Sequence, residues 1–266
     1  MNGSHDSQQQ FNALAANYAA SSVHRDGPSL PALVRLAQPV ATDVVLDVAT
    51  GTGHTALRLA PLVKSVVGVD VADGMLQQAR DLAAQQGAAN VSFQNADAQQ
   101  LPFADASFSL VVARHAPHHF RDADHFLSEV ARVLTPSGRF VLADQVSLGD
   151  TDQAWVDQFQ RLRDPSHFTQ RTPDQWFELA AAHGLDPKGL AFGNPEGQAF
   201  GEVVPYVLPF EWWVSQAGAE AVRLELVELL RSAPASVEVV WNADDEPESF
   251  VEPILVARFD LSPLAA

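Results

Sequence analysis

Three acidic side chains lie at the ends of short apolar runs, where they could bind the polar groups of a small molecule. They are Asp47, Asp70 and Asp97. A carboxylate accepts hydrogen bonds from hydroxyl and amino groups and attracts cationic groups. If the three runs are neighbouring parallel strands, their carboxyl ends meet at the edge of the sheet where ligands bind. The pattern therefore predicts a ligand site built from three strand ends.

A glycine-rich turn follows the first of these acids. The segment reads Asp47-Val48-Ala49-Thr50-Gly51-Thr52-Gly53 and continues into a helical pattern. Glycine permits a tight turn and lets a ligand approach the main chain, while the start of the next helix leaves amide donors free. We expect a buried strand that turns into a helix around a bound cofactor.

The residues of the glycine turn also match the sequence fingerprint of dinucleotide-binding proteins. Gly51-x-Gly53-x-x-Ala56 matches the glycine pattern, and Asp70 follows Gly51 at nearly the spacing of a ribose-binding acid. An NAD(P)-dependent Rossmann oxidoreductase is therefore an alternative. Asp47 argues against it, because a carboxylate four residues before Gly51 would repel a pyrophosphate and attract an ammonium group.

Composition excludes several classes of function. The chain has 266 residues, a formal net charge of −17 and no cysteine. Polyanion binding depends on Lys and Arg, so we expect no nucleic-acid partner. Disulfides, thiolate metal sites and a cysteine nucleophile are excluded. The polar N-terminus and the lack of a long apolar run predict a soluble cytoplasmic enzyme without membrane insertion.

Strand and helix patterns alternate along the first part of the chain. We expect strands at 44–48, 65–69, 91–94, 107–113 and 138–146, with helices at 54–62, 73–86 and 122–134. Such alternation predicts an α/β fold with a doubly wound, mostly parallel sheet. Further elements are a helix ending near His183, strands at 186–192 and 250–259, and an irregular stretch at 193–209.

We predict a single domain, 1–266, with a helical cap. The core comprises about 29–146, 172–192 and 250–260, and the cap about 1–28, 147–171 and 205–233, with residues 1 to about 10 disordered. Apolar positions at helical spacing within 219–232 would either pack on the domain or form a homodimer contact.

Several segments together resemble the class I S-adenosylmethionine (SAM)-dependent methyltransferases. The similarity covers the glycine turn, Val67 to Leu76, Asn95 to Phe103, Phe108 to Arg114 and Glu129 to Phe140. Within that superfamily the chain resembles the type 11 group, which includes the ubiquinone and menaquinone C-methyltransferases. The resemblance implies a Rossmann-like, seven-stranded sheet whose last two strands are antiparallel, and SAM as the cofactor.

The resemblance also implies roles for individual residues. Asp70 would hold both ribose hydroxyls of SAM, and Asp97 would accept a hydrogen bond from the adenine amino group. The backbone amide of the next residue, Ala98, would contact the adenine ring. The implied cofactor-binding set is Tyr18, Asp47, Ala49, Gly51, Gly53, Asp70, Val71, Met75, Asp97, Ala98 and Arg114. The implied function is methyl transfer to an O, N or C nucleophile of a small molecule, the alternative being a SAM-binding protein without transferase activity.

Histidines follow the fourth expected strand and could serve as a general base. His119 is the first candidate, and His118 and His167 are the reserves. The alternative is that His119 packs on the sheet and bonds the backbone. Pro117 interrupts any helix here and no zincin-type Glu is present, so we expect no metal.

Aromatic residues late in the chain indicate the kind of acceptor. Phe210, Trp212 and Trp213 would suit an apolar or aromatic small molecule, although aromatic side chains also simply fill cores. The stretch from Arg163 to His167 could contact the acceptor through His167. Alternatively, Arg163 and Asp164 could hold the cap in place by an ion pair.

Overall fold

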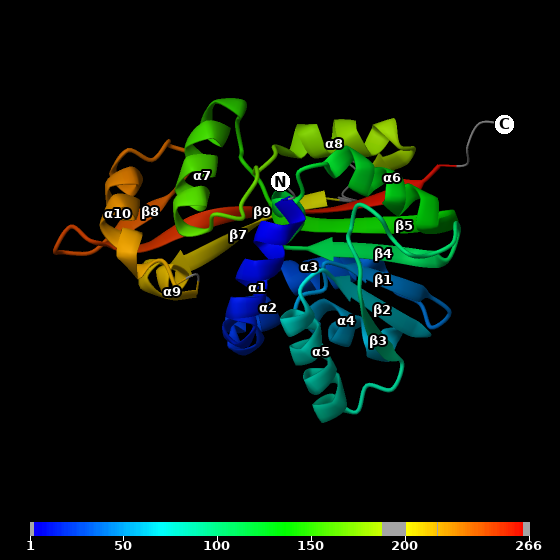
Figure 1. Cartoon of the computed structure of the whole chain (residues 1–266). Helices are drawn as coiled ribbons and strands as arrows, with labels where there is room; N and C mark the ends of the chain where they lie inside the picture. Colours follow the sequence, from blue (N-terminus) through cyan, green and yellow to red (C-terminus); the bar gives the residue numbers. More distant parts are fainter. Residues whose placement is uncertain (1–2, 188–200, 217, 263–266) are drawn as a thin grey trace.

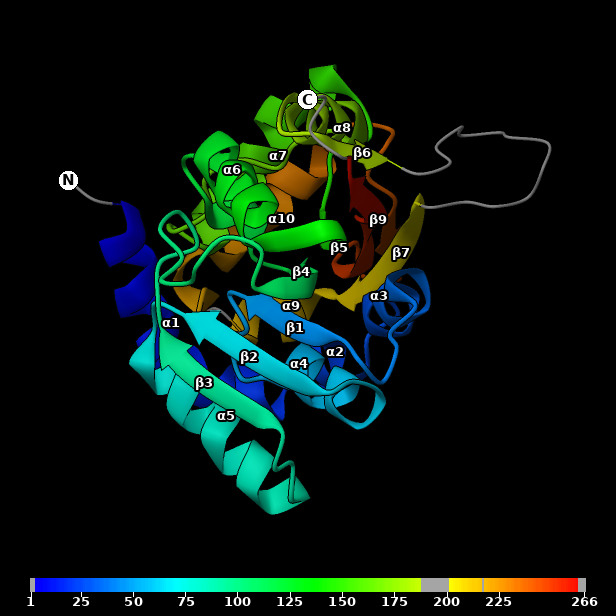
Figure 2. The ribbon, with the colours of Figure 1, turned by 90° about the vertical axis from the view of Figure 1, so that its right-hand side faces the viewer.

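The computed structural model describes residues 3–187, 201–216 and 218–262 and shows a mixed sheet flanked by helices. The described strands are β1 (Val44–Val48), β2 (Ser65–Asp70), β3 (Val91–Asn95), β4 (Phe108–Arg114), β5 (Leu134–Gln145), β6 (Leu185–Pro187), β7 (Gly201–Pro209), β8 (Val239–Trp241) and β9 (Pro247–Leu261). Seven of them follow the order β3-β2-β1-β4-β5-β9-β6, with β9 antiparallel to both neighbours. Figure 2 shows the twisted sheet with β3 at one edge. The predicted Rossmann-like sheet is confirmed.

Helices cover both faces of this sheet. They are α1 (Gly3–Ala20), α2 (Ser22–Asp26), α3 (Ser29–Ala37), α4 (His54–Leu59), α5 (Asp73–Gln86), α6 (Ala123–Val133), α7 (Asp150–Arg163), α8 (Pro173–Ala182), α9 (Phe210–Gln216) and α10 (Arg223–Arg231), with 3-10 turns η1 (Ala60–Leu62), η2 (Pro117–His119) and η3 (Glu220–Val222). Figure 1 shows α6 and α8 on one face and α4 and α5 on the other. Strand β1 is buried along nearly all its length because both faces are covered.

Helix α6 shows why these segments fold as they do. Its apolar positions Phe126, Leu127, Val130 and Val133 recur at helical spacing and are fully buried against the sheet. Asp122 caps its start by accepting a hydrogen bond from the backbone N–H of His125. The amphipathic pattern therefore decides which face of the helix meets the strands.

Strand β9 connects the core to the cap. Residues 254–260 pair with β5, while the earlier part of β9 pairs with β7 and β8. Figure 1 shows β9 running from beneath α7 and α10 into the main sheet. The prediction of an irregular stretch at 193–209 is wrong for 201–209, which form β7, so residues 205–209 belong to the sheet and not to a helical cap. Pairing with β9, which is distant in sequence, stabilises this strand.

Other boundaries also differ from the sequence-based expectation. Helix α1 begins at Gly3, so residues 3–10 are helical where disorder was expected. The strand expected at 186–192 appears as β6 at 185–187, and 188–192 lie outside the described residues. The helix expected at 219–232 is divided into η3 and α10, where Leu226 and Leu230 are buried and Leu224 is exposed. The homodimer contact stays a prediction. None of the described helices is both long and apolar enough to cross a bilayer.

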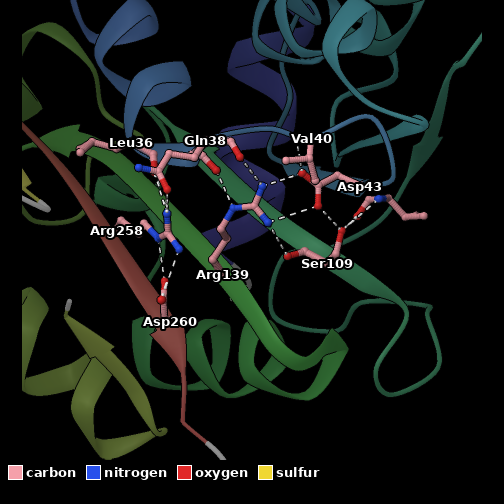
Figure 3. Close-up of polar contacts among 10 residues, drawn as sticks. Leu36, Gln38, Val40, Asp43, Ser109, Arg139, Arg258 and Asp260 are labelled. Atoms are coloured by element: carbon pink, nitrogen blue, oxygen red, sulfur yellow. Dashed lines mark hydrogen bonds and ion pairs between the residues drawn. The ribbon is translucent and has the colours of Figure 1, made fainter.

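An arginine network holds the edge of the sheet opposite the predicted site (Figure 3). Arg139 of β5 donates to both carboxylate oxygens of Asp43, at 2.5 and 3.2 Å, and to the carbonyl of Gln38. Ser109 Oγ also donates to Asp43, at 2.7 Å. These bonds hold the pKa of the Asp43 carboxyl below its ordinary value despite burial. The network fixes the loop between α3 and β1, and so the strand that carries the glycine turn.

Candidate active site

A large cavity, of about 400 Å³, opens at the carboxyl ends of β1, β2, β3 and β4. Such a volume is typical of small-molecule sites, and the position is the one expected of a parallel α/β sheet. Of the predicted cofactor residues, those that line it are Tyr18, Ala49, Gly51, Asp70, Val71, Met75, Asp97, Ala98 and Arg114. Four strand ends and the N-terminal helix therefore contribute to one cavity.

Asp70 is held in place by the glycine turn. Its Oδ2 accepts from the Gly51 backbone N–H and its Oδ1 from that of Ala72, each at 2.9 Å. Burial raises the pKa of this carboxyl above its ordinary value. The Val71 backbone N–H also bonds this carboxylate, so three of its four lone pairs are used and one stays open to a ligand.

The glycine turn has left-handed backbone conformations. Ala49, Gly51 and Gly53 have φ of 53°, 55° and 83°. A Cβ at Gly53 would lie 3.0 Å from Phe93 Cζ and Ala79 Cβ, so this position has no room for a larger residue. Gly53 does not line the cavity and instead begins α4. Ala49 adopts a conformation that L-residues rarely take, which indicates local strain at the site.

Asp47 lies one layer behind the cavity wall. Its side chain is 1% exposed and accepts from Thr50 Oγ1 at 2.6 Å. Burial raises its pKa to about 7, although Thr50 and the charge of Arg114 oppose that shift. The structure therefore places Asp47 against Thr50, and its predicted contact with an ammonium group stays a prediction.

Arg114 connects the strand end to the N-terminal segment. Its Nε donates to Thr55 Oγ1 at 2.9 Å, and its Nη atoms donate to Ser29 Oγ and to the His24 carbonyl. Both Arg114 and His24 line the large cavity. Arg114 thus holds the segment around α2 over the cavity.

The remaining cofactor candidates form the other walls. Asp97 Oδ1 accepts from the Gln99 backbone N–H at 2.9 Å, which fixes the loop after β3. Met75 packs with Tyr18 in a small apolar cluster. Burial raises the pKa of Tyr18, so its phenol is neutral at pH 7. The predicted residues are therefore close together, while their contacts with a cofactor stay predictions.

His119 faces the cavity in a form that can accept a proton. Its Nδ1 lies 3.1 Å from the Ser166 carbonyl oxygen, and a carbonyl can only accept, so Nδ1 carries the hydrogen. Nε2 therefore holds the lone pair, and it has no hydrogen-bond partner among the described residues. Burial lowers the His119 pKa below its ordinary value, so the ring is neutral at pH 7. The backbone contact considered as the alternative is therefore present, and the role of His119 as a base stays a prediction.

His118 and His167 are oriented differently. His118 Nδ1 lies 2.7 Å from Asp144 Oδ1, and His167 Nε2 lies 2.9 Å from Asp157 Oδ1. Neither lines the large cavity, but both line a second cavity of about 60 Å³. Among the described residues, no group of three or more metal-ligating side chains is arranged to hold an ion.

Sequence reasoning missed several residues of these cavities. His115 has φ of 52° and its Nε2 lies 3.0 Å from Ser29 Oγ, which also bonds the Tyr206 hydroxyl. Glu252 of β9 is buried beside the second cavity, and burial raises its pKa to about 7. A carboxylate inside the apolar run from Phe250 was the available signal for Glu252.

Comparisons with known proteins assign the family. A family model described as "Methyltransferase domain" matches residues 40–184. The chain belongs to this methyltransferase family. The uncharacterized methyltransferase YcgJ of Bacillus subtilis is 33% identical over 248 residues, which cover 90% of this chain and 93% of that protein. Its crystal structure matches with a TM-score of 0.79 at 30% identity, covering 88% and 98% of the two chains.

Two further relatives extend this comparison. A demethylmenaquinone methyltransferase of Deinococcus radiodurans is 46% identical over 105 residues, or 38% of this chain and 42% of that protein. Geranyl diphosphate C-methyltransferase of Streptomyces coelicolor, solved with S-adenosylhomocysteine (SAH), shares the fold with a TM-score of 0.64 at 12% identity, over 98% of each chain.

The protein is therefore a SAM-dependent methyltransferase, and the oxidoreductase alternative is wrong. The large cavity fits this cofactor in its chemistry, because the Asp70 carboxylate lines it beside an open backbone turn and still has an open acceptor position.

Proposed function

We propose that the methyltransferase transfers the methyl group in line to a small molecule whose nucleophile approaches from the second cavity. One observation carries this proposal: the two cavities share the walls formed by Phe11, Tyr18, His24, His115 and His119. Displacement at a methyl carbon needs the nucleophile opposite the leaving sulfur, and most of its catalysis can come from positioning. Adjacent donor and acceptor cavities supply that arrangement.

The chain's own residues then have distinct roles. Bound SAM supplies a methyl group on a positively charged sulfur. Asp70 and Asp97 would hold the nucleoside end, and Tyr18 and His24 would cover the reacting end from the N-terminal segment. His119 Nε2 would take the proton from an O–H or N–H nucleophile, since it carries the free lone pair at the shared wall.

The acceptor that this site favours is small and partly apolar. Trp212 and Trp213 line the second cavity. Aromatic walls of this kind suit the apolar or aromatic acceptor that the sequence predicts. The relative named as a demethylmenaquinone methyltransferase also acts, by its name, on a small molecule.

Methyl-labelled SAM tests the proposal. The protein would be incubated with panels of phenols, quinols, amines and carboxylates, and methylated products would be detected by mass spectrometry. Once an acceptor is found, SAM with a chiral methyl group should give inversion of configuration at carbon. Retention of configuration would show that a single in-line displacement does not occur.

A further inference from the structure

The second cavity has a composition that selects among acceptors. Its volume of about 60 Å³ admits roughly four to six water-sized groups, so it would receive the reacting end of an acceptor and not a large molecule. Its walls include Gln160 and Arg163 of α7, Gln145 of β5 and Glu252 of β9. These residues are far apart in sequence and meet only where the cap contacts the sheet.

The carboxyl groups of this cavity are partly engaged by the protein. Glu252 accepts from Gln145 Nε2 at 2.8 Å through one oxygen and from Gln160 Nε2 at 2.6 Å through the other. Asp164 Oδ1 accepts from Gln10 Nε2 at 2.7 Å, from Ser166 Oγ at 2.6 Å and from the Ser166 backbone N–H at 2.9 Å, whereas its Oδ2 has no recorded bond among the described residues. Carboxylate oxygens therefore stay open beside Arg163, and a cationic small molecule is the alternative ligand of this cavity.

Arg163, in contrast, presents donors that are not used. Its Nε donates to the Trp213 carbonyl at 3.0 Å, and its guanidinium carbon lies 4.5 Å from the centroid of the Trp213 ring. These two contacts hold the group rigidly. Its side chain also bonds the Tyr18 hydroxyl, so Trp213 and Tyr18 use two of its five N–H groups and the remaining ones have no recorded partner among the described residues. The ion pair with Asp164 considered from the sequence is likewise absent from the described contacts.

A second free polar atom lies in the same cavity. Gln145 Oε1 is buried without a hydrogen-bond partner among the described residues. The amide nitrogen donates to Glu252, and this bond fixes the orientation of the side-chain amide. Burial lowers the pKa of His115, His118 and His119, so these neighbours are neutral at pH 7. The cavity therefore offers a fixed cation with free N–H groups close to Gln145 Oε1, a buried acceptor without a donor.

We propose that Arg163 binds an anionic oxygen of the acceptor, such as a carboxylate, while Gln145 Oε1 accepts from a neighbouring O–H or N–H. This rests on the proposed function and adds the substrate class: small acids that carry a hydroxyl or amino nucleophile. A guanidinium suits this task because its planar N–H groups match the two oxygens of a carboxylate.

Three probes of equal shape and different charge test the inference. Benzoate, benzamide and benzylamine would be titrated into the SAH-loaded protein, with tryptophan fluorescence as the readout because Trp213 lies beneath Arg163. We expect benzoate to bind at least tenfold more tightly than benzamide. Arg163→Gln should abolish that preference, Arg163→Lys should keep part of it, and Arg231→Gln, which changes a cap arginine outside the cavity, should leave it unchanged.

The outcomes separate this inference from the proposed function. Tighter binding of benzylamine would show that Asp164 and Glu252 set the selectivity, and it would overturn the assignment of Arg163. Three other results would also overturn the assignment of Arg163. They are equal binding of benzoate and benzamide, no binding of benzoate, and a preference for benzoate over benzamide that survives Arg163→Gln. If the glutamine variant does not fold, the lysine variant decides: a reduced preference for benzoate supports recognition by the paired N–H groups of Arg163, and an undiminished preference overturns it. Failure of the wild type to bind SAH would contradict the donor site itself.

Discussion

Replacing Asp70 by Asn should weaken cofactor binding through the ribose specifically. In the structure the Asp70 carboxylate accepts backbone N–H groups of Gly51, Val71 and Ala72 and keeps a lone pair open to the cavity. An asparagine retains one accepting oxygen and places an NH₂ group where the other was. The variant should therefore lose one bond to a ribose hydroxyl and one bond to the glycine turn.

The magnitude follows from the strength of bonds to a charged acceptor. Such bonds contribute about 1.5–3 kcal/mol each, and about 1.4 kcal/mol corresponds to a factor of ten. Losing one ribose bond should therefore lower the affinity for SAH roughly tenfold to hundredfold, and loosening of the turn adds to that loss. Asp73→Asn is the matched control, because Asp73 bonds Asn95 and does not line the cavity. Its affinity should be unchanged.

Calorimetry with SAH and its 2′-deoxy and 3′-deoxy analogues separates the direct contact from the effect on the turn. The wild type should bind both analogues more weakly than SAH, whereas Asp70→Asn should discriminate much less against at least one of them. If the variant discriminates against both as strongly as the wild type, Asp70 does not hold the ribose hydroxyls, however large its overall effect. Unchanged SAH affinity in folded Asp70→Asn would remove the residue from the site.

Three further predictions concern the base, a buried acid and a close contact. His119→Asn should lower turnover by a factor of roughly 10²–10⁴, while the affinity for SAH, measured by calorimetry, stays near that of the wild type. Because burial lowers the His119 pKa, the wild-type rate should not change near pH 6.5 through titration of His119. A lower melting temperature with normal turnover would assign it a structural role. Glu252, whose pKa is raised to about 7, favours the folded state below its unfolded pKa, so its contribution to stability should fall by up to about 1.4 kcal/mol per pH unit between pH 5 and 7. Asp47 and Asp144, whose pKa is also raised to about 7, add to the same slope. Denaturant titrations should therefore show a smaller slope in Glu252→Gln than in the wild type, and equal slopes would contradict the argument. Gly68→Ala should cost about 1–3 kcal/mol of unfolding free energy, since a Cβ there lies 2.6 Å from Phe93 Cδ1, whereas Gly149→Ala has ordinary contacts and should be nearly neutral in the same denaturation assay.

Local patterns in the sequence determined the sheet and the donor side of the site. Buried runs such as Val44–Val48 and the amphipathic helices fix strand and helix by periodicity, which is a property of neighbouring residues. The glycine turn after Asp47 and the acid ending β2 are local as well, and parallel strands bring their carboxyl ends to one edge. The sequence therefore predicts Asp70 and Asp97 as residues of one site, and in the structure both line the large cavity.

Only the tertiary structure decided the second cavity. Arg163, Trp213 and Glu252 meet because β9 extends from the sheet into the cap, and pairing between distant strands leaves no local signal, as β7 shows. His118 and His119 make the same point at the smallest scale. They are adjacent in sequence, yet η2 turns one toward Asp144 and the other toward both cavities, because their surroundings come from β5 and the segment after α7.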